Sequence, residues 1–467
     1  MTIDVTVKPN APAHVLTDWT PEDPAYWQAK GSKVATRNLF ISMPSLLLAF
    51  AVWMVWSVVV VNLPNIGFKF DNDQLFWLTS LPGLSGATLR IFYSFMIPIF
   101  GGRLWTTLST ISLLAPAIGI GLAVQDPSTP YAAFLVLALL CGFGGGNFAS
   151  SMANISFFYP KAKKGTALGL NAGIGNLGVS VVQFVVPMVV GMSLFGGLGG
   201  EAQTWAKGAA TKAMWLQNAG FVWVPFIVAC AAAAWFGMND LSSAKASFAE
   251  QAVIFKRKHN WIMCWLYVGT FGSFIGYSAG FPLLTKIQFP DVNPLTYAFL
   301  GPLVGSIARV IGGFLSDRFG GGRVTFWTFL LMMVGVGGVL HFLAEKNFVG
   351  FLGSFLVLFA GTGIGNASTF QMIPAIFGIL HQRASHGRNP AAQAEASKAA
   401  GKEAAAVLGF SSAVAAYGAF FIPKGFGTSI SLTGGPQTAL YCYLAFYATC
   451  VVATWFWYTR ANAEVKC

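Results

Sequence analysis

The sequence is poor in charge, and poorest in acidic residues. Only 9% of its 467 residues are charged, and 28 lysines and arginines stand against 16 aspartates and glutamates. Hydrophobic residues make up 55% of the chain, well above the share in a water-soluble globular domain. The composition therefore excludes an ordinary soluble protein and predicts a chain that lies in a lipid bilayer.

Histidine and cysteine are also scarce, with five and six residues. The cysteines show no disulfide framework and no metal-ligand spacing, so we expect no bound metal and no cofactor. A membrane redox subunit would need histidine pairs inside its spans as haem ligands, and a sensor would need an appended signalling domain. An enzyme would need an acid-base pair within the membrane. The sequence offers none of these, so we expect the protein not to be an enzyme.

Long apolar runs recur along the whole chain, each long enough to cross the bilayer as a helix of about 20 residues. The runs predict twelve spans, near residues 38–62, 74–99, 105–125, 130–158, 166–193, 217–237, 261–285, 295–316, 324–343, 349–380, 404–427 and 437–459.

The net charge of +12 does not indicate nucleic-acid binding, because the basic residues are spread over the loops between spans. If the N-terminus is cytoplasmic, twenty basic residues fall on the cytoplasmic side and six on the other. The positive-inside rule then predicts that both termini are cytoplasmic.

The order of polar and apolar segments also predicts the domains. The first 36 residues hold no apolar core followed by a small-residue cleavage site, so we expect no cleaved signal peptide. A basic, polar segment then separates two groups of six spans. The expected units are an N-terminal tail (1–36), a first six-helix bundle (37–238), a linker (239–260), a second bundle (261–460) and a C-terminal tail (461–467).

The two halves repeat each other at an offset of 219 residues. Residues 83–90 read GLSGATLR and residues 302–309 read PLVGSIAR, so that Arg90 corresponds to Arg309. The same offset aligns GFGGGN at 142–147 with GTGIGN at 361–366. Because the same offset aligns two separate stretches of the sequence, the pattern favours a duplicated six-helix unit.

Arg90 and Arg309 are the basic residues predicted to lie deep within spans, whereas Lys424 lies near the end of the eleventh. An arginine at the centre of a membrane helix costs about 2.5 to 3.5 kcal/mol. All sixteen acidic residues fall in loops, tails or span ends, so no span offers a carboxylate. Backbone carbonyls or water remain an alternative partner, but the pattern favours a functional anion site.

As repeat equivalents, the two arginines are expected to face each other across a central cavity near the membrane midplane. A bound anion would relieve their mutual repulsion, and the planar guanidinium fork suits a planar oxyanion. Proton-coupled carriers usually need a titrating group inside a span, but only His341 approaches one, toward its outer end. This favours exchange, in which the empty carrier does not easily reorient.

Glycine is abundant, and most of its 53 residues are expected to allow close packing of helices. The GFGGGN run follows no strand and lies in an apolar span, so it does not predict a nucleotide site. Gly169, Gly173, Asn176 and Ser180 fall on one face of the fifth span, a bare surface with an amide and a hydroxyl.

Residues 313–323, GFLSDRFGGGR, resemble the loop signature of the major facilitator superfamily. The resemblance implies an all-α membrane protein with twelve transmembrane helices in two six-helix halves. The corresponding first-half loop, SFMIPIFGGR at 94–103, lacks the Asp-Arg pair, which puts the usual first-half charge latch in doubt. The residues expected to control conformational change are Asp317, Arg318, Gly145, Gly173, Gly363 and Gly365.

Residues 144–180, GGGNFASSMANISFFYPKAKKGTALGLNAGIGNLGVS, are similar to the nitrate signature of the NarK-type nitrate/nitrite porter family. The similarity extends through nearly all spans and is weakest at 193–216 and 381–403. It implies arginine ligands at Arg90 and Arg309, polar ligands at Asn176 and Tyr267, aromatic walls at Phe50, Phe148 and Phe271, and lesser contributions from Gly409 and Ser412.

The resemblance implies a nitrate/nitrite antiporter of the bacterial inner (plasma) membrane that works by rocker-switch alternating access and serves nitrate respiration or assimilation. Its expected partners are nitrate, nitrite and the lipid bilayer, with a functional monomer and no nucleic acid. Proton-coupled nitrate symport remains an alternative, as does exchange of another small oxyanion or an organophosphate.

Overall fold

The computed structural model describes residues 14–242, 244, 252–387 and 389–467. Residues 1–13 of the predicted N-terminal tail, and residues 243 and 245–251 of the predicted linker, lie outside the described residues. Arg388, one of the twenty basic residues expected on the cytoplasmic side, lies outside them as well.

The first half of the chain is helical almost throughout. Its helices are α1 (Pro24–Tyr26), α2 (Ser32–Met54), α3 (Trp56–Asn62), α4 (Asn72–Tyr93), α5 (Met96–Phe100), α6 (Gly102–Ile111), α7 (Leu114–Ala123), α8 (Tyr131–Leu140), α9 (Gly142–Phe158), α10 (Lys161–Val189), α11 (Asn218–Phe221) and α12 (Val224–Gly237).

The second half continues in the same way. Its helices are α14 (Lys258–Tyr267), α15 (Ser273–Gln288), α16 (Leu300–Phe319), α17 (Gly321–Ala344), α18 (Phe348–Ser385), α19 (Pro390–Ala416), α20 (Gly418–Thr433) and α21 (Gln437–Thr454).

Within the described residues, short π and 3₁₀ turns and four strands complete the fold. The π turns are η1 (Trp27–Gly31), η5 (Val268–Gly272) and η7 (Trp455–Thr459), and the 3₁₀ turns are η2 (Leu63–Ile66), η3 (Gly196–Gly199), η4 (Ala252–Lys256) and η6 (Pro294–Thr296). The strands are β1 (Val15–Leu16), β2 (Gln203–Lys207), β3 (Ala210–Met214) and β4 (Asp240–Leu241). Strands β2 and β3 form an antiparallel hairpin, and β1 pairs in parallel with β4.

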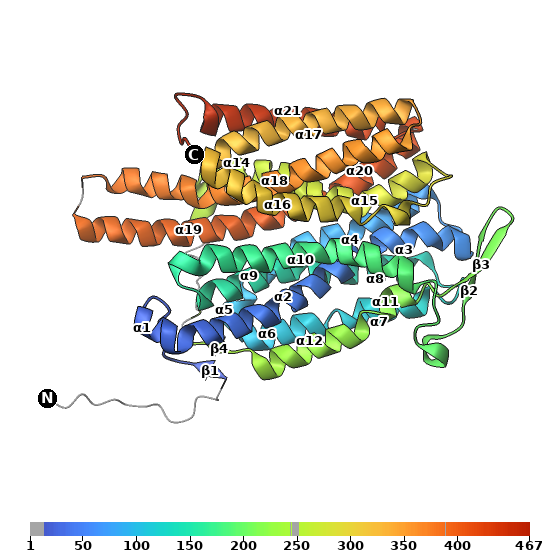
Figure 1. The fold of residues 1–467 in the computed structure, drawn as a ribbon, viewed down its shortest axis with the longest axis horizontal. Helices are drawn as coiled ribbons and strands as arrows, with labels where there is room; N and C mark the ends of the chain where they lie inside the picture. Colours follow the sequence, from blue (N-terminus) through green and yellow to red (C-terminus); the bar gives the residue numbers. More distant parts are fainter. Residues whose placement is uncertain (1–13, 243, 245–251, 388) are drawn as a thin grey trace.

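The long helices lie side by side along the long axis of the molecule (Figure 1). Strand β1 and the C-terminus lie at one end, which we call the terminal end. The β2–β3 hairpin lies at the opposite end, which we call the hairpin end.

Eleven helical segments of the described chain are long and apolar enough to cross a membrane. The predicted span without a counterpart among these eleven is the second, 74–99, which corresponds to α4 and α5. Helix α4 has 22 residues, enough to cross, but it is less apolar because its first turn carries Asn72, Asp73 and Gln74 and its last turn carries Arg90. The twelve-span, two-half fold is confirmed below by the comparison with known proteins.

The two halves meet at the hairpin end and separate at the terminal end, as one face of α10 shows. Toward the hairpin end, Ser180 Oγ donates to the carbonyl oxygen of Phe299 at 3.0 Å, and Gln183 Nε2 donates to that of Ser278 at 2.7 Å. Toward the terminal end, nothing lies within 4 Å of a Cβ built at Gly173 or Gly169. The same helix face is therefore packed at one end and open at the other.

Three segments depart from the sequence expectations. The region 193–216, expected as a loop, carries the β2–β3 hairpin. Helices α18 and α19 extend through most of 381–403, because Ala, Gln, Lys and Glu favour helix even outside a bilayer. Helix α2 begins at Ser32, inside the expected tail, since its first polar turns continue the hydrogen bonding of the first span.

Candidate functional site

Arg90 lies in the last turn of α4 and is fully buried, at 0% exposure. Its Nε donates to the carbonyl oxygen of Gly145 on α9 at 2.9 Å, and its Nη1 donates to that of Ser412 on α19 at 3.1 Å. Backbone carbonyls therefore hold the guanidinium group from both halves of the chain. Its Nη2 is buried and has no hydrogen-bond partner.

Arg309 lies on α16, and its guanidinium carbon is 5.8 Å from the ring centre of Phe370. Its Nη1 is also buried without a partner. Tyr267, at the end of α14 and 1% exposed, interacts electrostatically with both Arg309 and Arg90. The structure thus brings one phenol from the second half into range of both predicted arginines.

Neither arginine forms an ion pair with a carboxylate anywhere in the described residues. A buried cation without a counter-ion is costly, and each guanidinium group keeps a terminal nitrogen, with two N–H donors, without an acceptor. An oxyanion accepts from several donors at once and carries the missing charge. The pair is therefore suited to bind an anion.

Aromatic rings surround Arg90. Its guanidinium carbon lies 4.9 Å from the ring centre of Phe148, 5.4 Å from Phe271 and 5.3 Å from Trp53. Phe148 and Phe271 are stacked across the two halves, with centroids 6.2 Å apart and planes at 24°. Phe50 packs edge-on to Phe148 at 6.0 Å. The rings keep water away from the charge, which strengthens its interaction with a bound anion.

The chain matches known proteins along most of its length. Residues 45–392 match the family described as Major Facilitator Superfamily. The chain is 51% identical over 461 residues to the Nitrate/nitrite transporter NarU of Escherichia coli (strain K12), a match that covers 97% of this chain and 98% of that protein. It is 44% identical over 462 residues to the Probable nitrate/nitrite antiporter NarK2 of Thermus thermophilus, covering 97% and 98%.

The chain belongs to the nitrate/nitrite porter family of the major facilitator superfamily. A solved structure agrees on the fold. It is the inward-facing, unoccupied bacterial homologue of the human lysosomal transporter Spinster, with a TM-score of 0.57 at 15% identity over 91% of this chain and 94% of that one. The resemblance and the fold class inferred from the sequence are confirmed.

The remaining predicted ligands of this porter lie on α10 and α19. Asn176 is 1% exposed, and its Oδ1 is buried without a partner. Gly409 faces open space, with nothing within 4 Å of a built Cβ. Ser412 bonds Arg90 through its backbone oxygen, while its hydroxyl donates to the carbonyl oxygen of Gly409 at 2.8 Å. The roles of these residues as ligands stay predictions.

The residues predicted to control conformational change lie in two kinds of surroundings. A methyl group at Gly145 would meet the Trp53 ring at 2.6 Å, one at Gly363 would overlap the backbone of Gly305, and one at Gly365 would meet Thr270 at 2.5 Å. These three glycines allow neighbouring helices to touch, which fits the expected close packing. Gly173 differs, because it faces the opening between the halves.

The Asp317–Arg318 pair at the terminal end of α16 makes no ion pair in the part of the chain that is described. Asp317 Oδ1 accepts a hydrogen bond from Gln371 Nε2 at 3.0 Å, and the Arg318 guanidinium lies over the ring of Phe319 at 5.3 Å. The predicted gating function of the pair remains a prediction.

Asp240 is a residue that sequence reasoning missed. The first-half loop has no Asp-Arg pair, but the Oδ1 of Asp240 accepts from the backbone N–H of Arg103 at 2.8 Å, and its Oδ2 lies 3.6 Å from Arg103 Nε. A carboxylate from the segment after α12 thus caps the N-terminus of α6. Because Asp240 lies 137 residues from Arg103, no local motif reveals it.

Trp53 was missed too. Its indole Nε1 donates to the carbonyl oxygen of Pro82 in α4 at 2.6 Å, while its ring lies against Arg90. Trp53 therefore positions the helix that carries the arginine. Its spacing of three residues from Phe50 places both on one face of α2, which is the signal that could have found it.

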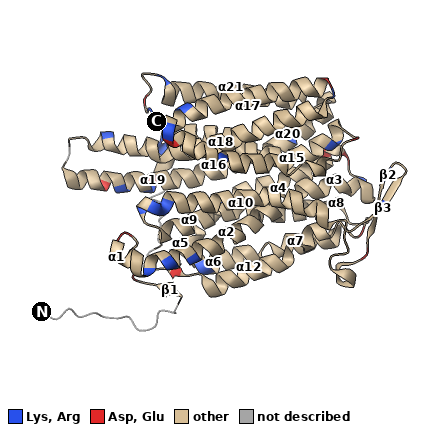
Figure 2. Ribbon diagram, in the orientation of Figure 1, with Lys and Arg blue, Asp and Glu red and all other residues tan. Residues whose placement is uncertain are grey.

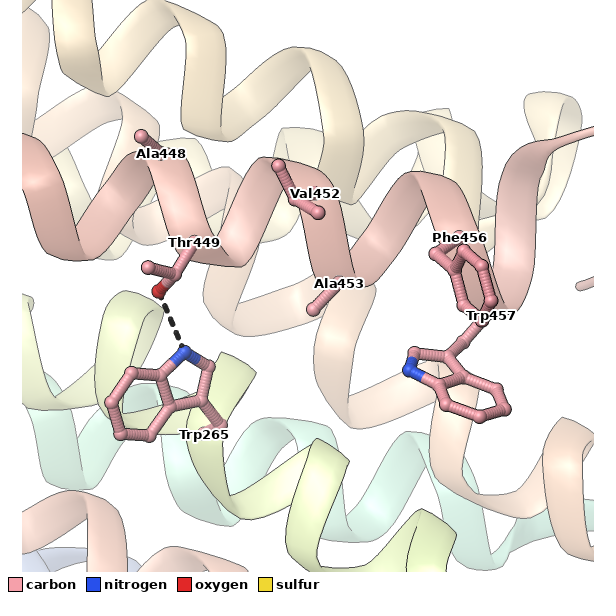
Figure 3. Close-up of a pocket in the computed structure, with 7 residues that line it drawn as sticks. All are labelled: Trp265, Ala448, Thr449, Val452, Ala453, Phe456 and Trp457. Atoms are coloured by element: carbon pink, nitrogen blue, oxygen red, sulfur yellow. Dashed lines mark hydrogen bonds between the residues drawn. The ribbon is translucent and has the colours of Figure 1, made fainter.

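A hollow on the outer surface lies between α14 and α21, apart from this site (Figure 3). It is lined by Trp265, Ala448, Thr449, Val452, Ala453, Phe456 and Trp457. The polar contact drawn in it is the 2.9 Å hydrogen bond from Trp265 Nε1 to Thr449 Oγ1. With no charged side chain in its wall, this hollow is not suited to bind an anion.

Proposed function

We propose that this porter exchanges nitrate for nitrite across the bacterial inner membrane by rocker-switch alternating access around Arg90 and Arg309. The observation that carries the proposal is the pair of buried, partnerless donors, Nη2 of Arg90 and Nη1 of Arg309. They come from opposite halves of the chain. An anion between the halves would accept from both and would supply the negative charge that the site lacks.

The aromatic surroundings favour a small, flat anion. Phe148 and Phe271 turn their ring faces toward each other beside the Arg90 guanidinium, and flat surroundings of this kind favour a planar oxyanion whose oxygens meet the guanidinium donors. Nitrate and nitrite are planar, carry one negative charge each, and could share one site. The names of the two relatives, NarU and NarK2, point to the same substrates.

Exchange follows from the same charges. The site offers arginine, which stays protonated at physiological pH and hands over no proton. When the empty carrier closes its terminal end, the buried cations would remain without a counter-ion, a costly intermediate. With an anion bound, the charges are offset and the halves can move. Substrate therefore has to travel in both directions, and the porter would act as a monomer in the lipid bilayer without a cofactor.

The distribution of charge supports an orientation in the membrane. Lysine and arginine gather mainly at the terminal end (Figure 2). By the positive-inside rule that end is cytoplasmic. The separation of the halves there, beside Gly169 and Gly173, then corresponds to an inward-open conformation with its outer side closed.

The test is uptake of labelled nitrate into proteoliposomes. We expect rapid uptake when nitrite or nitrate is inside, and almost none when the vesicles contain no substrate anion. A pH gradient that drives uptake into anion-free vesicles would instead establish proton symport. Phosphate that competes as well as nitrate would count against nitrate as the substrate and favour a carrier of another small oxyanion or of an organophosphate.

A further inference from the structure

Two lysines at the hairpin end reach across the contact between the halves. Lys286, in the last turn of α15, donates from Nζ to the carbonyl oxygen of Val61 on α3 at 2.5 Å and to Asn65 Oδ1 at 3.0 Å. In the opposite direction, Lys207 of the β2–β3 hairpin donates from Nζ to the carbonyl oxygen of Pro290 at 2.5 Å. Each half therefore places one ammonium group on neutral oxygen atoms of the other half.

The charge on these lysines is not offset by a carboxylate. Among the described residues, neither lysine forms an ion pair, and Asp291, next to Pro290, pairs with neither of them. The charge of Lys207 acts unfavourably on Lys286. Lys424, the other lysine between the halves at this end, is paired with Asp73. The positive charges of Lys286 and Lys207 are therefore not neutralised by a neighbouring carboxylate.

The position of Lys286 connects it to the arginine site. Segment α14–η5–α15 carries Tyr267 and Phe271 near the arginines and Lys286 near its far end. The bonds of Lys286 to Val61 and Asn65 show that this face of α15 looks toward the first half. If the halves separate at the hairpin end, Lys286 loses these acceptors and lies on the wall of the opening, with free donors.

We propose that Lys286, helped by Lys207, is an outer docking site for the anion when the hairpin end is open, a site that rests on the proposed exchange of small oxyanions. In the closed state the Lys286 ammonium group donates to the oxygen atoms of Val61 and Asn65. In the open state a monovalent oxyanion takes their place before moving to the arginines. An ammonium group is a strongly hydrated point charge, so it attracts the anion without holding it in one geometry.

The experiment measures the sidedness of exchange. In proteoliposomes of defined orientation, the KM for labelled nitrate is determined at the hairpin side and at the terminal side, with saturating nitrite opposite. Lys286→Gln should raise the hairpin-side KM about fivefold, the effect of one charge at contact distance in water, and leave the terminal-side KM unchanged. Lys286→Arg, which keeps the charge, should restore most of the affinity.

Lys212→Gln is the matched control. Lys212 lies on the same hairpin with its ammonium group over Trp205, at 4.7 Å, and we expect no change in either KM. A second control is ionic strength: potassium gluconate should raise the wild-type hairpin-side KM toward that of Lys286→Gln.

An unchanged hairpin-side KM, or equal changes at both sides, would overturn the docking site and leave Lys286 as a closing contact alone. Variants are compared after size-exclusion chromatography has shown a folded protein, and Lys286→Arg covers the case in which Lys286→Gln does not fold. Failure of the proposed function gives a different result, since the wild type would then exchange no nitrate from either side.

Discussion

The guanidinium Nη1 of Arg90 donates a hydrogen bond to the backbone oxygen of Ser412 at 3.1 Å. This bond joins α4 of the first half to α19 of the second, and Thr88 of α4 shares a hydrogen bond of 2.9 Å with Tyr417, the residue between α19 and α20. Relative movement of the halves has to break or replace both contacts. A bound anion that attracts Arg90 competes with the Ser412 oxygen, which gives the substrate a direct effect on a contact between the halves.

Replacing Arg90 or Arg309 singly by Lys should abolish most transport while the protein still inserts. An ammonium group keeps the charge, but it does not bond Gly145 and Ser412 in the fork geometry of Arg90 while offering a further donor to an anion. Loss of one charge-assisted hydrogen bond, about 2 kcal/mol, corresponds to a decrease of about 30-fold in exchange rate at limiting nitrate.

The control for this experiment is Arg383→Lys. Arg383 bonds the backbone oxygen of Glu464 at the terminal end and should exchange nitrate at the wild-type rate. Wild-type exchange by Arg90→Lys would show that charge alone suffices and that the planar fork has no function.

Gly173 and Gly363 should respond to substitution in opposite ways. Gly363→Ala places a methyl group into the backbone of Gly305, so its thermal midpoint should fall by the equivalent of about 1 to 3 kcal/mol. Gly173→Leu meets open space in this conformation and should melt like the wild type. It should nevertheless slow exchange strongly, because closure of the terminal end has to bring the second half against this face.

The two measurements are a thermal melt in detergent and nitrate exchange in proteoliposomes. Gly378→Leu, another position on a long helix with nothing within 4 Å, serves as a comparison for the effect of a large side chain on the melt. Wild-type exchange by Gly173→Leu would contradict a closing movement at this face.

The arginines could be predicted from a local signal, because Arg90 and Arg309 stand out in apolar runs. Tyr267 and Phe271 were expected only from the resemblance to the porter family, because aromatic residues in membrane helices usually serve packing. The structure confirms the fold around them, while their function as ligands is still to be tested. Trp53 was overlooked because a tryptophan in an apolar helix is usually a packing residue.

Long-range partners could not be predicted from local patterns. Asp240 reaches Arg103 across 137 residues, and Lys286 reaches Val61 across 225. Such contacts depend on how the helices are arranged, which hydropathy does not encode. The β2–β3 hairpin was not predicted for another reason: it is a short, mostly exposed ribbon outside the spans. Strand β2 alternates only between half-buried and exposed residues, and β3 is exposed up to Met214, so neither shows the apolar face of a packed strand.

Asp240→Ala should lower stability through the N-terminus of α6. The substitution removes the carboxylate that accepts from the Arg103 backbone and lies beside its side chain. Loss of such a cap costs about 1 to 2 kcal/mol. Asp240→Asn keeps an oxygen that can accept from the Arg103 N–H, so its thermal stability should lie between those of the wild type and Asp240→Ala. A thermal melt checks this, with the exposed Glu201→Ala as control, and a wild-type melt for Asp240→Ala would contradict the capping function.

The Asp73–Lys424 ion pair should influence the balance between the conformation closed at the hairpin end and the conformation open there. It joins α4 to α20 at the hairpin end, with the atoms 2.5 Å apart, and it exists while that end is closed. Asp73 is partly exposed, so the pair contributes about 0.2 to 1 kcal/mol. Asp73→Asn should therefore raise the population open at the hairpin end by up to about fivefold.

Labelling of a cysteine introduced at Thr79, which is buried on α4, by a membrane-impermeant reagent added from the hairpin side measures that population. Lys424→Gln should raise the labelling rate as much as Asp73→Asn, and the exchanged pair Asp73→Lys with Lys424→Asp should restore the wild-type rate. If the exchanged pair labels as fast as either single variant, the attraction between these two charges does not hold the hairpin end closed.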